Sequence, residues 1–577
     1  MEPKRSSGLR MGLVCGVAYS VLFVLAFPPF GLDLLALVAL VPLIVASRPD
    51  RRLVRVGLGV WLGALLSWGY LHRWVWTNDV TRLGFVLMTM YLAVYPALFV
   101  VVLGRVRRGS RLALWFVAPT LWATLEFVRG HIVFHGYPWY LIGHPLADRV
   151  LISAYAPVIG AYGVSAIVAW MNTCIALAIS RVAKRPRLRM APRWIGGVGA
   201  LVVVLVGGLL LHLRTGRHLL EDAKTNQSIR VAVVQTDVPQ SNKMGASAEE
   251  RAATMAFLLR ETERASGGEP KPDVIVWPET MYPWSVGISA DSVREQARLG
   301  LSALDWYMEM LSVQARAGVP IVVGSIAFDG LHIEFDDTGN VSKFEWANQY
   351  NSAFVVDDGE VKPERYDKVF LTPFGEVMPY ISAWGWLEKQ VTALGASGMS
   401  FDLDAGERAR TLSIGTDRGT IAVATPICFE ATMPAVCRRL VFDGGGRRAA
   451  VMLNLTNDGW FGNARGVREN HLLAARWRCM ELGTPMVRAA NTGISAGIDA
   501  SGRVVRMGLD GDEPGVRGDR RAGVMTVSVA PGVRGATVYA KTGEWPMWMM
   551  SLCGVALVAA SYRGKKPEEA KETDAQT

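Results

Sequence analysis

Long apolar runs fill the first part of the chain and return once near its end. Several approach the roughly 20 residues that an α-helix needs to cross a bilayer, and the shorter ones can cross where the bilayer thins. The runs cover residues 11–27, 32–47, 53–71, 84–104, 112–128, 150–180, 194–213 and 546–561. This pattern predicts a seven-span transmembrane domain over residues 1–215 and a C-terminal transmembrane helix over 545–562.

The hydrophobic period changes at Ile229. Apolar and β-branched runs of a few residues now alternate with helical stretches near residues 247–265, 291–316 and 467–482. The short β runs lie at residues 229–234, 274–277, 321–325, 353–356, 420–424, 449–455, 486–489 and 524–529. Strands and helices in this order predict a layered, water-soluble α/β domain over residues 228–540, with residues 563–577 as a polar tail.

Positive charge follows the loops between the apolar runs. The 577 residues carry a net charge of +10, which taken alone would suit nucleic-acid binding. Lys and Arg residues gather instead at the N-terminus, at the start of the tail, and in the loops at 48–55, 105–111 and 181–193. The loops at 28–31, 74–82 and 129–149 hold few Lys or Arg. By the positive-inside rule, both termini are cytoplasmic and the α/β domain is extracytoplasmic. Because membrane topology explains the positive charge, no nucleic-acid partner is expected.

One carboxylate, Glu126, falls near the end of the apolar run at 112–128. An ionisable residue inside a membrane is a candidate functional group. The alternative is an ion pair with Arg129, three residues further on, and this alternative is favoured. The aromatic residues of Gly136-Tyr137-Pro138-Trp139-Tyr140 suit the outer headgroup region, and they could also line a path for lipid.

Three strand ends carry residues suited to nucleophilic catalysis. Glu279 follows the β run at 274–277, Lys368 follows Arg365-Tyr366-Asp367, and Cys428 follows the β run at 420–424. A thiol nucleophile needs a base for its proton and positive charge where an oxyanion develops. Glu279 can serve as the base and Lys368 as the compact cation. A helix that begins after Cys428 could also lower the pKa of the thiol.

Two further carboxylates lie close to these residues in the sequence. Glu376 stands eight residues after Lys368, and Glu430 stands two residues after Cys428, so either could orient Lys368 or a substrate. Taken singly, each charged residue is better explained as a solvated charge or a structural ion pair, and a lone Cys as a small buried residue. It is their joint occurrence at three strand ends that indicates a site.

A competing motif is Gly493-Ile494-Ser495-Ala496-Gly497, which matches the G-x-S-x-G nucleophile elbow of serine hydrolases. That machinery needs a His after the Ser, and the last His in the chain is His471, so the match is interpreted as chance. Six Cys residues are present with no CxxC pair, and no His cluster has zinc spacing. Neither a metal nor another cofactor is expected.

The motifs around these residues are similar to those of the nitrilase (carbon–nitrogen hydrolase) superfamily. They are WPE at 277–279, YDK at 366–368 with PFGE at 373–376, CFE at 428–430, NLTNDGWFG at 454–462 and RAANTG at 488–493. With the apolar spans on both sides, nearly the whole chain resembles the bacterial apolipoprotein N-acyltransferase family. The resemblance implies an αββα sandwich fused to a multi-span helical membrane domain in the bacterial inner membrane, with the sandwich in the periplasm.

The resemblance also implies roles for single residues. Glu279 would be the general base and acid, Lys368 the cation and Cys428 the nucleophile, with Glu376, Phe429 and Glu430 as supporting residues. The family reaction is ping-pong: the thiolate takes a fatty acyl group from a membrane phospholipid as a thioester. The α-amine of an S-diacylglyceryl-cysteine lipoprotein then accepts that group as an amide.

One position departs from the family pattern. The family usually has a Trp shortly after the Pro-Gln that follows the first strand of the α/β domain. Here Pro239-Gln240 leads to Met244, which can fill an apolar lid position but offers no aromatic wall. This difference bears on the acyl donor that the enzyme prefers.

Two other functions remain open from the sequence. A membrane-tethered amidase or nitrilase that hydrolyses small amides needs the same three residues but has no reason for eight spans. A receptor with an outer ligand-binding domain would not depend on Cys428. No coiled-coil or dimer motif is present, and a monomer is expected.

Overall fold

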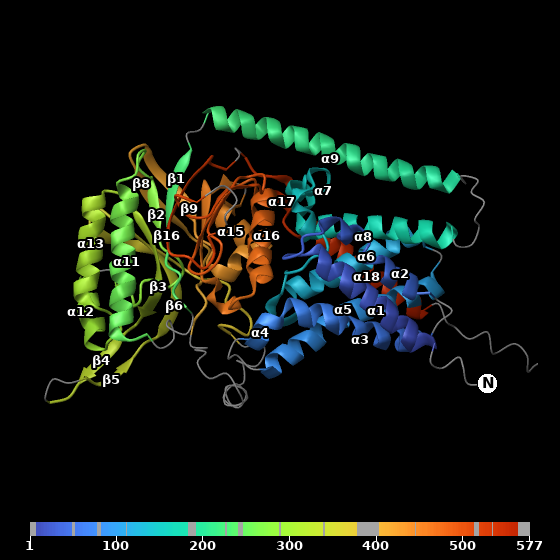
Figure 1. The fold of residues 1–577 in the computed structure, drawn as a ribbon, viewed down its shortest axis with the longest axis horizontal. Coiled ribbons are helices and arrows are strands. Elements are labelled where there is room, and N and C mark those ends of the chain that lie inside the picture. The colour runs from blue at the N-terminus through green and yellow to red at the C-terminus, as the bar shows by residue number, and fades with distance from the viewer. Residues whose placement is uncertain are drawn as a thin grey trace, which may run out of the picture.

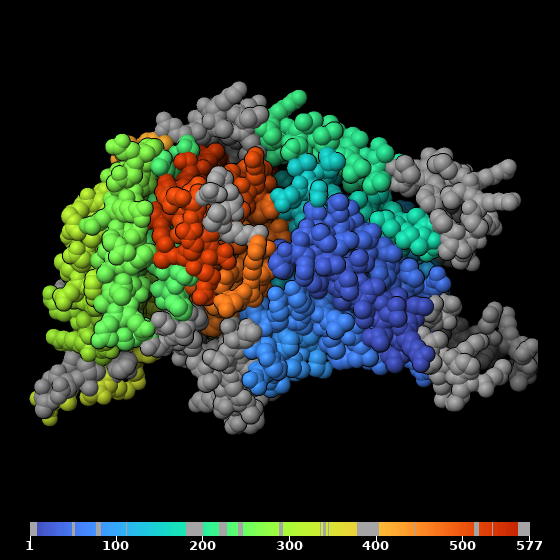
Figure 2. Space-filling model, in the orientation of Figure 1, coloured from blue at the N-terminus to red at the C-terminus, as the bar shows by residue number. Residues whose placement is uncertain are grey.

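The computed structural model describes residues 7–48, 52–77, 82–110, 112–182, 192–225, 228–239, 246–287, 290–337, 341–377, 403–444, 446–512, 518–532 and 535–563. A bundle of apolar helices and an α/β domain lie end to end (Figure 1). Figure 2 shows the blue and teal N-terminal helices in direct contact with the orange and red part of the α/β domain.

The helical bundle holds most of the predicted membrane spans. Among the described residues, five helices are long and apolar enough to cross a membrane. They are α1 (Ser7–Ala26), α3 (Leu53–Leu71), α5 (Arg82–Gly109), α8 (Ala156–Val182) and α18 (Trp545–Arg563). Many of their large apolar side chains face outward, among them Leu62, Leu66, Leu98, Leu552 and Val555. An outward apolar surface of this kind is what lipid contact requires.

The remaining three predicted spans differ from one another. The run at 112–128 forms α6 (Leu114–His131), and the run at 194–213 lies within α9 (Pro192–Thr225). The run at 32–47 is not one helix: it is broken into the 3-10 helix η1 (Asp33–Leu37) and the short α2 (Val41–Ala46). Pro42 lies in the first turn of α2, where its missing N–H costs no intrahelical bond, whereas inside one continuous helix it would remove a hydrogen bond and clash with the preceding turn.

Glycine allows α1 and α3 to touch along their backbones. A Cβ on Gly12 would lie 2.1 Å from the carbonyl oxygen of Val56, and one on Gly59 would lie 2.3 Å from that of Leu9. Gly16 and Gly63 repeat this contact one turn further along. Without a hydrophobic force between helices in lipid, close packing of small residues is what holds such pairs together.

The α/β domain contains two six-stranded sheets stacked face to face. The first sheet has the order β16-β1-β2-β3-β6-β7, and the second has the order β15-β14-β13-β12-β9-β8. The strands of the first are β1 (Ile229–Gln235), β2 (Val274–Val276), β3 (Ile321–Asp329), β6 (Asn348–Asp357), β7 (Glu360–Asp367) and β16 (Gly523–Val529). Those of the second are β8 (Thr411–Thr416), β9 (Gly419–Ala424), β12 (Val451–Thr456), β13 (Met486–Ala490), β14 (Ala496–Ile498) and β15 (Val504–Met507).

Helices cover the outer face of each sheet, which completes the αββα sandwich (Figure 1). On the first sheet lie α11 (Ala248–Ser266), α12 (Ala290–Arg298) and α13 (Leu304–Ala317). On the second lie α15 (Pro434–Val441) and α16 (Arg465–Leu482). The single helix predicted near 291–316 is therefore two helices, and Gly300 between them has a φ of +68°, which a continuous helix does not allow. A hairpin of β4 (His332–Phe335) and β5 (Val341–Glu345) projects from this end.

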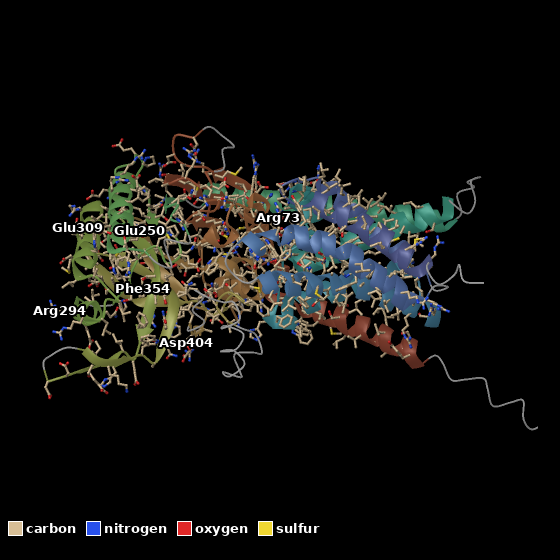
Figure 3. The ribbon with its side chains drawn as sticks, turned by 60° about the horizontal axis from the view of Figure 1, so that its bottom comes forward. Arg73, Glu250, Arg294, Glu309, Phe354 and Asp404 are labelled. Atoms are coloured by element: carbon tan, nitrogen blue, oxygen red, sulfur yellow. The ribbon has the colours of Figure 1, made fainter. Side chains whose placement is uncertain are left out.

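The α16 helix forms a large part of the contact between the two parts of the molecule. The Trp477 indole donates to the carbonyl of His144 (3.1 Å), and Glu481 accepts from the backbone N–H of Ala161 (2.7 Å). One hydrophobic core runs from the membrane helices through α16 into the space between the two sheets, and a second core lies under α11 and α13. The outer surface of the sandwich is charged instead. Figure 3 shows Glu250 on α11 and Glu309 on α13, at the end of the sandwich away from the membrane helices.

Candidate active site

The three residues singled out at strand ends meet between the two sheets. Glu279 follows β2 and Lys368 follows β7, both from the first sheet, whereas Cys428 follows β9 of the second and begins the 3-10 helix η4 (Cys428–Thr432). The Glu279 loop passes close to Gly324, where a Cβ would lie 2.5 Å from the carbonyl oxygen of Pro278. Glu279 and Lys368 are buried, and Cys428 is half-buried.

Two hydrogen bonds hold the Glu279 carboxylate. Its Oε1 accepts from the Asn351 side-chain amide at 2.8 Å, and its Oε2 accepts from the backbone N–H of Asn457 at 2.9 Å. Asn351 also donates to Glu376 Oε1 at 3.3 Å, so one amide spans both carboxylates. Sequence reasoning missed Asn351, because it lies among other polar residues of β6, such as Gln349 and Ser352, and gives no signal of its own.

Lys368 lies between two carboxylates. Its Nζ is 2.7 Å from Glu376 Oε2 and 3.7 Å from Glu279 Oε1. Burial favours the neutral amine, but the charges of Glu376 and Glu279 outweigh it and raise the pKa of Lys368 above its usual range. The same contact with Lys368 overcomes burial at Glu376 and lowers the pKa of that carboxyl. The cation therefore persists at any physiological pH.

The Cys428 thiol does not have the lowered pKa that a helix N-terminus was expected to produce. Burial, followed by the nearby Glu279 charge, raises its pKa to about 12, against the opposing effect of Lys368. The helix that begins at Cys428 is a five-residue 3-10 turn, too short for a large dipole. The thiol is thus neutral at rest and needs a base before it can attack.

Glu430 joins the lysine segment to the nucleophile turn. It accepts from the backbone N–H groups of Val369 (2.8 Å), Phe370 (2.9 Å) and Ile427 (2.8 Å), and from the Tyr366 hydroxyl (2.9 Å). Burial raises its pKa to about 7, against the lowering effect of these bonds. Its carboxyl thus holds the backbone beside Lys368 and beside Cys428 at once.

Aromatic rings from the membrane part cover the residue after the nucleophile. The Phe429 ring stacks on Trp139 (6.0 Å between centroids, 18° between planes) and lies 6.4 Å from Tyr137. Phe370 stacks near Phe429 as well, at 6.1 Å. The loop at 136–140, first noted for its aromatic residues, therefore forms a wall of the site.

Glu126 and Arg129 support this loop. The ion pair favoured from the sequence is not formed among the described residues. Instead, Glu126 Oε1 accepts from the backbone N–H of Ile142 at 2.8 Å, and Arg129 donates to the carbonyls of Trp139 (2.7 Å) and Tyr140 (3.2 Å). Both side chains are buried, which makes these bonds the compensation for their burial.

Of the two other residues singled out in the sequence, Ser495 and Met244, the structure describes only Ser495. The Ser495 hydroxyl donates to Gln235 Oε1 at 2.6 Å and accepts from the backbone N–H of Ala490, so it forms an ordinary buried structural contact. Met244 lies outside the described residues.

Comparison with known proteins gives a family for both parts of the chain. Residues 19–174 match the model of the apolipoprotein N-acyltransferase N-terminal domain, and residues 230–529 match that of carbon-nitrogen hydrolases. An apolipoprotein N-acyltransferase from Geobacter metallireducens is 30% identical over 571 residues, which cover 96% of each chain. This chain belongs to the apolipoprotein N-acyltransferase family.

Another family member, from Bordetella bronchiseptica, is 30% identical over 548 residues and 88% of each chain. Among solved structures, Nit3 of Saccharomyces cerevisiae is 16% identical with a TM-score of 0.32, covering 56% of this chain and 94% of its own. Membership of the apolipoprotein N-acyltransferase family makes this protein a membrane enzyme that transfers acyl groups.

Proposed function

We propose that the protein transfers a fatty acyl group from a membrane phospholipid to the N-terminal S-diacylglyceryl-cysteine of apolipoproteins, by a ping-pong reaction through a Cys428 thioester. The observation that carries the proposal is the meeting of Glu279, Lys368 and a neutral Cys428 thiol under an aromatic wall supplied by the membrane part. Family membership supports the reaction class.

In the first half-reaction, Glu279 takes the proton of the Cys428 thiol, and the thiolate attacks the ester carbonyl of the phospholipid. Lys368, held as a cation, stabilises the oxyanion of the tetrahedral intermediate. When the C–O bond breaks, Glu279 returns its proton to the leaving alkoxide, and a lysophospholipid departs. The acyl group stays on Cys428 as a thioester.

In the second half-reaction, the free α-amine of the lipoprotein attacks the thioester carbonyl. Glu279 takes a proton from the attacking nitrogen, the C–S bond breaks, and the proton passes to the Cys428 sulfur. The products are an amide and the original thiol. Exclusion of water by Phe429, Tyr137 and Trp139 favours attack by the amine over hydrolysis.

We assign supporting roles to the neighbouring side chains. Glu376 fixes Lys368, Glu430 holds the backbone on both sides of the site, and Phe429 contacts the aromatic wall. Met244 would fill the lid position where the family usually has Trp. No cofactor enters either half-reaction.

We further propose the membrane arrangement that follows from loop charge. Residues 1–215 and 545–562 span the bacterial inner membrane, both termini and the tail at 563–577 are cytoplasmic, and the catalytic domain at 228–540 is periplasmic. Both substrates are lipid-anchored, which gives the enzyme a reason to hold its site at the membrane surface. The protein would act as a monomer.

A two-step transfer assay tests this proposal. Purified enzyme in detergent would receive phospholipid with a labelled acyl chain, then either a diacylglyceryl-Cys peptide or the same peptide with an acetylated amine. The proposal predicts label in the free-amine peptide alone. Label released mainly as free fatty acid with both peptides, or turnover of small amides only, would favour a hydrolase instead.

A further inference from the structure

The backbone at Cys428 is held in an unusual conformation. Its φ is +50°, in the left-handed region that residues with a Cβ seldom adopt. Such a conformation persists only when its surroundings impose it, and it concentrates at active sites. The residues that impose it here lie outside the proposed triad of Glu279, Lys368 and Cys428.

Two side chains contact the carbonyl groups on either side of this turn. The Asn454 amide donates to the carbonyl of Pro426 at 2.8 Å, and the His471 ring places Nε2 at 3.4 Å from the carbonyl of Cys428. Asn454 lies on β12 and His471 on α16, so the turn is held from two elements at once.

One buried guanidinium links these two side chains. Arg488, on β13, donates from Nη1 to Asn454 Oδ1 at 2.9 Å, and its Nη2 lies 2.9 Å from His471 Nδ1. The same Nη2 donates to both oxygens of Asp458, at 2.8 and 2.7 Å, which balances the charge of Arg488. Arg488 and Asp458 are fully buried. A planar fork of fixed donors can make these bonds together, whereas a Lys ammonium cannot.

The proton position on His471 decides whether its ring can hold Cys428. Burial and Arg488 lower the pKa of His471, so the ring is neutral and only one nitrogen carries a proton. In the tautomer in which Nδ1 accepts from Arg488, the proton lies on Nε2, which then donates to the carbonyl of Cys428. The competing tautomer would donate from Nδ1 to Asp458 Oδ1, also at 2.9 Å, and would leave the Cys428 carbonyl without this donor.

We propose that Arg488 is a positioning residue that acts through Asn454 and His471 to fix the left-handed backbone of Cys428 and so aim its sulfur at the acyl carbonyl. The inference rests on the proposed function, because it takes Cys428 as the nucleophile. It gives a task to the sequence segments 454–462 and 488–493, to which the triad assigns no chemistry. Precise aim matters because small misplacements of reacting atoms slow a reaction strongly.

A matched pair of variants at His471 tests the proposal. The amide nitrogen of His471→Gln falls near the position of Nε2, and that of His471→Asn falls near Nδ1. We expect His471→Gln to keep the single-turnover rate of Cys428 acylation by phospholipid within about threefold, and His471→Asn to lose about tenfold, as for one hydrogen bond of ordinary strength. If His471 only filled space, His471→Gln would have no reason to be faster than His471→Asn. Equal rates for the two variants, or a faster His471→Asn, would overturn the proposal.

Arg488→Lys provides the second arm, with Arg465→Lys as its control. Arg465 lies on the exposed face of α16 in an ion pair with Glu469, so Arg465→Lys should match the wild type. Arg488→Lys should slow acylation at least as much as His471→Asn. If Arg488→Lys does not fold, as judged by its thermal transition, the His471 pair still tests the link through which Arg488 acts, and a missing difference between the two His471 variants overturns the proposal.

Alkylation of Cys428 by iodoacetamide, followed by peptide mass mapping, separates this proposal from the proposed function. The reagent needs no lipid substrate, and it reacts with the thiolate, so its rate reports the accessibility of Cys428 together with its ionisation in every variant. If the wild-type protein alkylates at Cys428 but never accepts an acyl group, the proposed function fails. If the wild type is acylated normally and the His471 and Arg488 variants are too, only the positioning role fails.

Discussion

The two sheets supply opposite kinds of chemistry to the site and stabilise it by different means. The first sheet contributes the charged residues Glu279 and Lys368, and Glu376 follows on the same side, so stability there depends on charges that compensate one another. The second sheet contributes Cys428, a neutral thiol in a constrained backbone turn. On that side, the buried side chains of Asn454 and His471 contact backbone carbonyl groups and determine the geometry of the turn.

This difference separates two ways of damaging the enzyme. A change among the charged residues leaves a buried charge without its partner, and both stability and turnover should suffer. A change at an uncharged residue around the nucleophile turn, such as Asn454, leaves every charge paired, so turnover should fall without the cost of an unpaired buried charge. Each of the following predictions tests one side of the comparison.

The largest effect is expected for Lys368→Met. Removing the cation leaves Glu279 and Glu376 facing each other in a buried site, which should destabilise the fold by about 3–5 kcal/mol and abolish turnover. Thermal unfolding in detergent and the labelled transfer assay measure the two losses. The double variant Lys368→Met/Glu376→Gln should regain stability but no activity. Normal turnover in Lys368→Met would remove Lys368 from the mechanism.

A smaller loss is expected for Glu376→Gln. The amide still fills the space, but it removes the charge that contributes most to raising the pKa of Lys368, so that pKa should fall. Loss of one charge-assisted hydrogen bond predicts a decrease in acylation rate of about tenfold to a hundredfold. Quenched single-turnover reactions measure the acylation rate. Glu360→Gln serves as the control, because the Glu360 side chain on β7 is exposed. An unchanged rate would show that Glu279 alone is enough to hold the cation.

Trp139→Ala should have a moderate effect. The Trp139 ring stacks on Phe429 and lies 5.3 Å from the His471 ring, so its loss removes a contact on the nucleophile side without disturbing any charge. Aromatic contacts of this kind predict a two- to tenfold slower acylation, roughly. Because the Trp139 ring is buried, the cavity left by Trp139→Ala should also lower the free energy of unfolding, by about 3–5 kcal/mol, whereas Trp139→Phe should keep most of the stability and restore most of the rate. A Trp139→Phe variant as slow as Trp139→Ala would contradict this role for an aromatic ring.

The smallest effect is expected for Met244→Trp. If this position is a lid wall, a larger apolar ring should be tolerated and should change the preferred acyl donor more than the maximal rate. Transfer rates for phospholipids of several chain lengths measure the preference. A collapse in membrane expression would argue against a lid at this position.

Much of the architecture could be predicted from the sequence, because the hydrophobic patterns that indicate helices and strands are local features of the chain. The strand ends at Glu279 and Cys428 followed from short β runs, and long apolar runs predicted the membrane helices α1, α3, α5, α8 and α18. Strands with weaker hydrophobic patterns, such as β7 and β8, were not predicted. The break in the run at 32–47 was missed as well, since average hydropathy does not register one proline.

What could not be predicted depends on contacts between residues far apart in the chain. Glu126 and Arg129 lie three residues apart, which suggested an ion pair, yet each binds the backbone of the loop beyond them. Burial of Cys428 raises the pKa of its thiol, and only the folded packing determines that burial. The Arg488 network joins three elements and has no periodic signature at all.

The most direct test is the intact mass of the protein after incubation with phospholipid and no amine acceptor, with Cys428→Ser measured beside the wild type. The account predicts that the wild type gains the mass of one fatty acyl group, that hydroxylamine removes it, and that Cys428→Ser shows no hydroxylamine-labile adduct. A folded wild-type protein that gains no mass, or an adduct that persists at another residue in Cys428→Ser, would contradict the assignment of Cys428 as the acyl-carrying nucleophile.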